Sequence, residues 1–148
     1  MCAAEKTSTT LDDVKKDVLS CLRPLQWAQV VFTSATTGQR LQKILSAVTD
    51  AGAEHRRRLS TATLNMVLQE TVAWRSPPSS PNGKRGRIYY VTQASTRPPT
   101  FVFFVNDAKL FTDDYKRYCE KQLRQNIGFP GTPLRIFWRG KPPRASEN

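Results

Sequence analysis

The sequence contains few of the residues that build metal centres and disulfide frameworks. Its 148 residues include three widely separated cysteines, Cys2, Cys21 and Cys119, and a single histidine, His55. No two cysteines have the C-x-x-C spacing of a zinc or redox motif. We therefore expect no metal site, and the odd cysteine count is typical of a protein from a reducing compartment.

Long hydrophobic runs are also missing. No apolar stretch approaches the roughly 20 residues that cross a bilayer. The first six residues contain no apolar core of the kind that a secretory signal needs. Neither a membrane protein nor a secreted one is expected, and the hydrophobic content of 39% is enough for one domain with a core.

Positive charge is abundant and unevenly placed. The net charge is +11. Residues 1–52 hold six basic and five acidic side chains, whereas residues 53–148 hold seventeen and seven, so the two parts carry +1 and +10. The basic character belongs to the C-terminal part, for which a polyanion such as a nucleic acid is the natural partner.

The N-terminal part, residues 11–56, predicts a helix, a strand and a second helix. Thr10 is a suitable N-cap for the first helix, which is expected to end before Pro24. Residues 28–33 (AQVVFT) favour a buried strand, and apolar spacing predicts a helix from about residue 39 to 57. A buried strand needs neighbours, so this part resembles the end of a larger sheet domain.

The C-terminal part, residues 57–141, predicts helix, strand, strand, helix and strand. Ser60 and Thr112 are the expected N-caps of the two helices. The expected strands cover residues 87–92, 101–105 and 134–139, and the Pro- and Ser-rich stretch 76–86 is expected to be a loop. This order predicts an α+β sandwich with two helices on one face of a three-stranded sheet. Its expected core aromatics are Tyr89, Tyr90, Phe101, Phe103, Phe104, Tyr115, Tyr118 and Trp138.

Three stretches carry a family resemblance that covers about residues 11–141. They are HRRRLSTATLNMVLQETV, IYYVTQASTRPPTFVFFVND and GFPGTPLRIFWRGK. They closely resemble the C-terminal KH-like domain of the Der (EngA) GTPase family of bacteria and plastids. The resemblance implies an α-β-β-α-β KH-like domain preceded by the last helix–strand–helix of a P-loop GTPase domain. It also implies a role in assembling the large ribosomal subunit, in the bacterial cytoplasm or the plastid stroma.

In the same resemblance, Ser34, Ala35 and Thr36 match the S-A-K loop that contacts guanine, with Thr36 in place of the usual lysine. The other nucleotide motifs, G-x-x-x-x-G-K-[ST], D-x-x-G and N-K-x-D, do not occur. We therefore expect no GTPase activity, no catalytic residue and no cofactor for this chain, whereas GTP and Mg²⁺ are implied for the full-length family. The chain is expected to be a fragment or an incomplete product.

Basic side chains and one aromatic ring provide the candidate contacts to ribosomal RNA. The candidates are Arg56, Arg57, Arg58, Lys84, Arg85, Arg87, Arg97, Arg135, Phe137, Arg139 and Lys141. The last strand is the most informative, because alternation places Arg135, Phe137 and Arg139 on the face away from the helices. The alternative is that this face packs on a GTPase domain and makes no RNA contact. Both alternatives remain open at this stage.

Three further expectations concern the rest of the chain. The basic residues at 116–124 are interpreted as the solvated face of a helix. Gly128-Phe129-Pro130-Gly131 has the G-x-x-G spacing of KH domains, but its position after a helix favours a structural C-terminal cap. Residues 1–10 and 142–148 are expected to be disordered, the chain to be monomeric, and limited proteolysis to cut first between residues 51 and 58.

Overall fold

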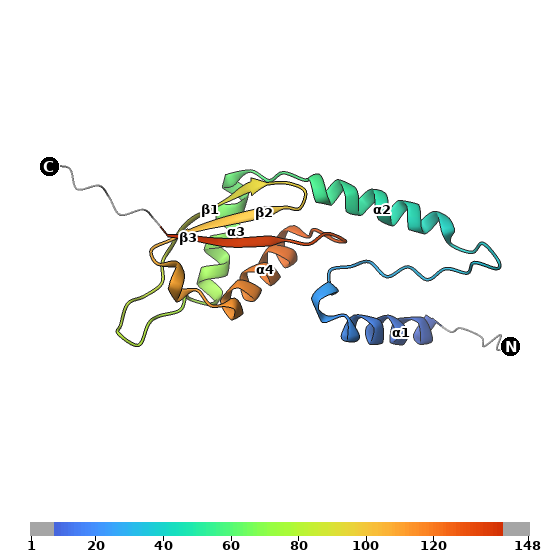
Figure 1. Ribbon diagram of the computed structural model, residues 1–148, viewed down its shortest axis with the longest axis horizontal. Coiled ribbons are helices and arrows are strands. Elements are labelled where there is room, and N and C mark those ends of the chain that lie inside the picture. Colours follow the sequence, from blue (N-terminus) through green and yellow to red (C-terminus); the bar gives the residue numbers. More distant parts are fainter. Residues whose placement is uncertain (1–7, 141–148) are drawn as a thin grey trace.

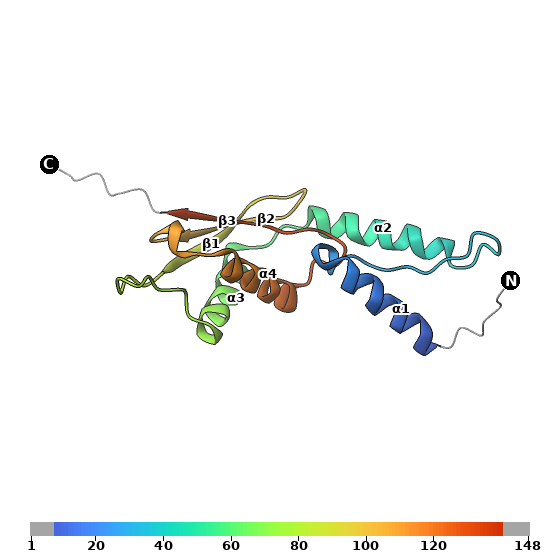
Figure 2. The same cartoon turned by 60° about the horizontal axis from the view of Figure 1, so that its bottom comes forward.

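The computed structural model describes residues 8–140 (Figure 1). Its C-terminal part is the predicted sandwich. Helices α3 (Thr61–Trp74) and α4 (Asp113–Ile127) accompany strands β1 (Ile88–Ser95), β2 (Thr100–Val105) and β3 (Arg135–Gly140). The strand order is β1-β2-β3, with β1 and β2 antiparallel and β2 and β3 parallel. Figure 2 shows both helices on one side of this sheet, which confirms the α+β fold class.

The core lies between the sheet and these two helices. Leu64, Val67 and Leu68 of α3 are buried, as the helical spacing predicts. The inward residues of α4, among them Tyr115 and Cys119, are buried against the same sheet face. The strands contribute alternate residues: Val91, Phe101, Phe103, Val105 and Ile136.

Three expected core aromatics, Tyr89, Tyr90 and Phe104, do not belong to this core. Tyr89 and Tyr90 are each 45% exposed. The register of β1 and β2 shifts between Ile88 and Tyr90, and from Tyr90 to Gln93 the strand alternates with Val91 and Gln93 inward. Composition alone had assigned both tyrosines to the core, and the register of the strand corrects this.

The ends of the helices follow from local chemistry. The Ser60 hydroxyl accepts a hydrogen bond from the Thr63 backbone N–H, as an N-cap should. Thr112 precedes α4 without such a bond, and Asp113 and Asp114 occupy the first turn. At the other end Gly128 has a φ of 104°, a conformation that favours glycine, and terminates the helix.

The N-terminal part contains two helices and no strand. Helix α1 (Ser8–Cys21) begins two residues before the expected cap at Thr10, a 3₁₀ turn η1 follows at Arg23–Leu25, and α2 spans Leu41–Arg56. Residues 28–33 run extended but outside any ladder, so the expected strand is wrong. The described residues form a single sheet, which offers this segment no neighbouring strand to pair with.

Apolar side chains of this N-terminal part remain uncovered. The exposed ones lie on both helices and include Val14, Leu41, Leu45 and Val48. Ala28, Gln29 and Val31 line a hollow together with residues of α2 between positions 44 and 51, so the extended segment lies alongside that helix. An apolar stripe without a partner is the surface that a larger sheet domain would cover.

The two parts are nevertheless joined by specific contacts. The Gly131 N–H donates to the Trp27 carbonyl (2.9 Å), and the Arg97 N–H donates to the His55 carbonyl (3.0 Å). The side-chain amide of Gln93, 4% exposed, accepts from the Leu59 N–H (2.7 Å) and donates to the Arg57 carbonyl (2.9 Å). The segment that follows α2 is therefore anchored to the sheet.

Candidate nucleic-acid interface

Strand β3 has one buried side and one exposed side. Ile136 is 2% exposed and Trp138 packs against the core, where its ring lies 4.6 Å from that of Phe111. Arg135, Phe137 and Arg139 face the other way and are exposed. The alternation expected from the sequence is thus present in the structure.

The neighbouring strands extend this exposed side into a surface, which we call the open sheet face. Cross-strand pairing places Tyr90, Phe104 and Arg139 in one row. The next row contains Thr92, Val102 and Phe137, and beyond it Thr100 pairs with Arg135. The open sheet face is therefore wider than the single stripe that the sequence indicated.

Aromatic rings on the open sheet face contact neighbouring side chains. Tyr90 stacks on Phe104 with ring centroids 4.4 Å apart and planes 19° apart. Phe137 is 52% exposed, and the Lys116 ammonium lies 5.9 Å from its ring centroid. Sequence reasoning missed Tyr90 and Phe104 because it counted aromatics toward the core without assigning strand register. The period-two pattern of β1 contained the signal.

The three arginines after α2 have different environments. Arg56 and Arg58 are exposed, as a nucleic-acid contact requires. The Arg57 guanidinium is paired with Glu54 (2.9 Å), donates to the Ile127 carbonyl (3.3 Å) and lies 5.3 Å from the centroid of the Phe129 ring. Arg57 therefore has a structural role in joining α2 to the loop after α4.

The basic residues of the Pro- and Ser-rich loop also differ in their environments. The Lys84 ammonium is bonded to Asp107 (2.8 Å), and this bond holds the pKa of the Asp107 carboxyl below its usual value. Arg85 and Arg87 have exposed side chains, and their backbones are anchored by the Asn106 amide. Arg85 and Arg87 are consequently more available to a ligand than Lys84.

Two candidates remain from the predicted set. Arg97 is exposed in the β1–β2 connection and has a positive φ of 66°. Lys141 lies outside the described residues. The structure brings Arg135, Phe137 and Arg139 onto one surface. The candidates of the Pro- and Ser-rich loop and of the segment after α2 do not belong to the sheet rows of that surface.

The G-x-x-G segment is held against the rest of the molecule by Phe129 and Gly131, while Pro130 is exposed. Phe129 is fully buried, and the Arg124 guanidinium donates to the carbonyls of Phe129 and Thr132, each at 3.1 Å. A Cβ at Gly131 would meet the Ala51 Cβ at 2.9 Å, so α2 closes over this loop. These contacts give the loop a structural role in joining α4 to α2, as its position after a helix suggested.

The guanine-loop match forms a tight turn at the end of α2 remote from the sheet (Figure 1). The Ser34 N–H donates to the Gln39 carbonyl (3.2 Å), and the hydroxyls of Ser34 and Thr36 are 3.1 Å apart. Ala35 is exposed, so its backbone lies at the surface. The hollow beside the turn measures about 230 Å³, below the usual range for a small-molecule pocket.

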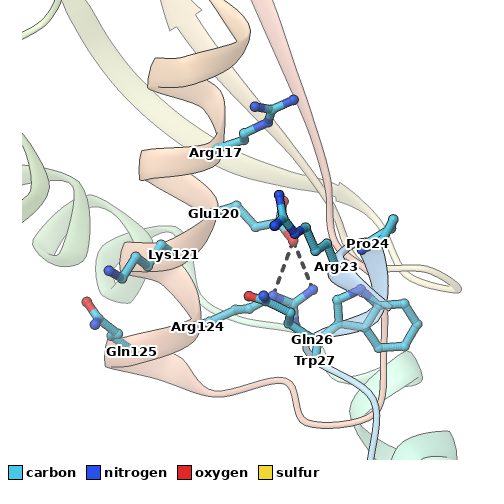
Figure 3. Close-up of a pocket in the computed structure, with 9 residues that line it drawn as sticks. All are labelled: Arg23, Pro24, Gln26, Trp27, Arg117, Glu120, Lys121, Arg124 and Gln125. Carbon is cyan, nitrogen blue, oxygen red and sulfur yellow. Dashed lines mark hydrogen bonds and ion pairs between the residues drawn. The ribbon is translucent and has the colours of Figure 1, made fainter. Parts of the chain in front are cut away.

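The basic face of α4 is not uniformly solvated, contrary to expectation. Arg124 is fully engaged: besides the two carbonyls it binds the Glu120 carboxylate (3.0 Å) and lies 5.7 Å from the centroid of the Trp27 ring. Arg117 and Lys121 are exposed beside it, on the wall of a cleft that η1 closes (Figure 3). Sequence spacing on one helix could not show that a distant segment lies across it.

Residues 8–140 contain no cluster of three or more His, Cys, Asp or Glu side chains that could hold a metal ion. None of the helices described there is long and apolar enough to cross a bilayer.

Comparison with known proteins gives a consistent result. Residues 58–139 match the family described as "KH-domain-like of EngA bacterial GTPase enzymes, C-terminal". The chain is 53% identical over 145 residues to GTPase Der of Prochlorococcus marinus (strain MIT 9313) and 52% identical to that of Rippkaea orientalis. These alignments cover 98% of this chain but only 32% of each relative, so the chain spans about a third of their length. On this evidence the chain belongs to the family of EngA (Der) C-terminal KH-like domains.

Proposed function

We propose that this chain is the RNA-binding module of a Der-type ribosome-assembly GTPase and that it binds ribosomal RNA of the large subunit. The observation that carries the proposal is the open sheet face, where Arg135 and Arg139 flank the exposed ring of Phe137. The net charge of +10 over residues 53–148 supports the same partner.

The chemistry of this surface suits a nucleic acid strand. Residues two apart on β3 lie on one side of the sheet, roughly 7 Å from each other. Arg135 and Arg139 are four positions apart, roughly 13 Å, with Phe137 midway between them. The two arginines could therefore contact phosphates on either side of an intervening nucleotide whose base stacks on Phe137. The stacked pair Tyr90–Phe104 adds a second flat apolar platform in the row of Arg139.

A second candidate function is docking on a GTPase domain without RNA contact. It is favoured by the apolar part of the open sheet face, since Tyr90 and Phe137 are each about half exposed and Val102 lies beside Phe137 in the same row. Sheet faces of this composition are commonly covered by another domain. The two functions exclude each other only if both partners need the face at the same time.

The charge-reversal variant Arg135→Glu with Arg139→Glu tests the first function. Binding of a fluorescently labelled fragment of large-subunit ribosomal RNA is measured by anisotropy over a salt series. We expect the variant to lose at least about tenfold in affinity and to show a shallower salt dependence, because fewer counterions are released. The matched control is Lys15→Glu with Lys16→Glu on α1, which changes the net charge by the same amount at exposed positions.

The outcomes separate the two functions. Loss of RNA binding in the sheet variant alone supports the RNA module. If the RNA affinity of the sheet variant equals that of the control variant, or if the parent chain binds no RNA at low salt, the proposal is wrong. Loss of binding to isolated Der GTPase domains, with RNA affinity unchanged, would support the docking function instead.

Nucleotide chemistry is proposed only for a longer protein that contains this module. The relatives are named GTPases, and this chain aligns with about a third of their length. GTP and Mg²⁺ would then be bound by the remaining two thirds. Within this chain, the turn at Ser34, Ala35 and Thr36 could contribute only a backbone contact to guanine.

A further inference from the structure

A cleft of about 680 Å³ lies on the outer side of α4, opposite the side that packs on the sheet (Figure 3). One wall is α4 itself, from Arg117 to Gln125, and the other is the segment from Arg23 to Trp27. We call this feature the α4 cleft. Its volume lies within the usual range for small-molecule sites and would accommodate a nucleotide unit.

The charge of the α4 cleft is positive and largely unpaired. Glu120 is neutralised by Arg124, whose guanidinium nitrogens are all engaged with Glu120 or with backbone carbonyls. The cations of Arg23, Arg117 and Lys121 make no hydrogen bond or ion pair with any other residue between positions 8 and 140. Three neighbouring cations without counter-charges raise the local potential and favour an anionic ligand.

An aromatic ring accompanies these cations. Figure 3 shows the Trp27 indole beside Arg124, and their centres are 5.7 Å apart. The Trp27 carbonyl accepts from the Gly131 N–H (2.9 Å), which ties the backbone of this residue to the KH-like part. The backbone of Trp27 is thus anchored and its ring has the Arg124 guanidinium as a neighbour, which lowers the entropic cost of placing the ring against a ligand.

A second hollow lies over the same helix. Gln125 lines both this hollow and the α4 cleft, and the second hollow, of about 450 Å³, is bordered by Trp74, Tyr118 and Gln122. Trp74 is 83% exposed, more than any other large hydrophobic residue described as exposed. An indole this exposed has almost no packing role, so its apolar surface is available to a ligand.

We propose that the outer face of α4, from Trp27 to Trp74, is a second RNA-binding surface that takes a single-stranded segment. Phosphates would contact Arg23, Arg117 and Lys121, and bases would stack on the two indoles. This inference rests on the proposed RNA-binding function and adds a surface separate from the open sheet face. Single strands fit better than duplexes, because only unpaired bases present their faces to aromatic side chains.

An acidic peptide is the competing ligand for such a basic surface. Two indoles separated by cations suit alternating bases and phosphates better than a peptide, in which negative charge can be placed at every residue. The polar amides of Gln122 and Gln125 between the indoles could hydrogen-bond base edges. The physical observations therefore favour RNA, and the peptide becomes an arm of the test.

The test uses the full chain labelled with 5-fluorotryptophan, so that Trp27, Trp74 and Trp138 give separate ¹⁹F resonances. The probes are a short oligouridylate, an RNA duplex of equal length and a polyglutamate peptide. We expect oligouridylate to shift the resonances of Trp27 and Trp74 while the partly buried Trp138 moves least. Duplex RNA and polyglutamate should shift Trp27 and Trp74 less than oligouridylate does.

Two variants locate the binding. Arg117→Glu with Lys121→Glu should weaken oligouridylate binding by at least about tenfold and lower the salt slope by roughly 1.4, the value for two phosphate contacts on a single strand. Trp74→Ser should weaken binding severalfold without changing the unfolding midpoint, since its side chain is exposed. Lys15→Glu with Lys16→Glu is again the control for net charge.

The outcomes distinguish this inference from the proposed function. If the parent chain binds RNA but the Arg117/Lys121 variant matches its control and the two indole resonances stay unshifted, the α4 surface is wrong and the open sheet face stands alone. If the parent binds no RNA, the proposed function itself fails. Shifts of Trp27 and Trp74 with polyglutamate but not with oligouridylate would overturn RNA in favour of an acidic protein partner.

Discussion

His55 Nδ1 lies 2.8 Å from Thr132 Oγ1, although the two residues are 77 positions apart in the chain. The contact joins the last turn of α2 to the loop that leads into β3, and Thr132 is only 1% exposed. The N-terminal part and the KH-like part therefore share a polar contact at a buried site. The consequence is that α2 should unfold together with the KH-like part.

The first prediction concerns this hydrogen bond. Thr132→Val keeps the volume of the side chain and removes the hydroxyl, leaving His55 without its partner. We expect a loss of about 1–2 kcal/mol in the free energy of unfolding, measured by urea denaturation. In a double-mutant cycle with His55→Leu, the two changes should be non-additive by at least about 0.5 kcal/mol. Full additivity would show that the contact does not couple the two parts.

The second prediction compares two glycines with the same backbone conformation. Gly131 and Gly38 have φ values of 71° and 68°, so alanine is strained at both positions. At Gly131 the new Cβ would also meet Ala51 at 2.9 Å, whereas at Gly38 nothing lies within 4 Å. We expect Gly38→Ala to cost about 1 kcal/mol and Gly131→Ala at least twice that.

Thermal unfolding of both variants checks this comparison. The Gly131→Ala variant should also lose protection of α2 in hydrogen exchange, because the clash pushes that helix away from the loop. Equal destabilisation of the two variants would mean that α2 moves aside at no cost and does not pack tightly on the G-x-x-G segment.

Much of the KH-like fold could be predicted from the sequence because its local signals agree. Ser60 caps a helix with a regular apolar stripe, and Gly128 ends another, so both helices were expected within a few residues of their observed bounds. The expected strand at residues 28–33 does not form, and its absence has a physical reason. Its composition favours a strand, but composition cannot supply the neighbouring strands that a ladder requires.

The candidate interface could be predicted from the sequence only where the pattern of a single strand or helix was enough to place its residues. Alternation along β3 was enough to place Arg135 and Arg139 on one side. The contribution of Tyr90 depends on pairing between β1 and β2, and the α4 cleft depends on η1 crossing a helix almost a hundred residues further along the chain. Relations of this kind are set by tertiary packing, which leaves no periodic trace in the sequence.

The third prediction concerns thiol reactivity. Cys119 is 1% exposed, and burial raises its pKa to about 12, so the reactive thiolate is scarce at pH 8. Cys21 is exposed. In a Cys2→Ser variant, we expect Ellman's reagent to titrate one thiol rapidly and the second only after urea is added. Rapid reaction of both thiols in the native protein would show that the core around Cys119 opens readily.

The fourth prediction concerns nucleotide binding. The turn at Ser34 could offer guanine one backbone contact, but most nucleotide affinity comes from groups that hold the phosphates and Mg²⁺. Isothermal titration of the chain with a non-hydrolysable GTP analogue and Mg²⁺ should therefore give no heat above dilution. Saturable binding in the micromolar range would contradict this argument from the missing motifs.

The fifth prediction revises where a protease cuts first. The sequence suggested residues 51–58, but Arg57 is anchored there by Glu54, Gln93 and the Ile127 carbonyl. Arg40 lies instead in an exposed turn after a segment without ladder hydrogen bonds, where local opening costs little. With limiting trypsin we expect cleavage after Arg40 to precede cleavage after Arg56 or Arg58.

Mass spectrometry of timed samples gives the order of these cuts, and the arginines after α2 act as internal controls for the same protease. After the cut at Arg40, α2 should remain with the KH-like part, because His55 and Arg57 still hold it. The fragment that begins at Leu41 should then unfold in one cooperative transition. If cleavage at positions 56–58 comes first, the anchored junction opens more easily than the turn, and the contacts at His55 contribute little to holding the two parts together.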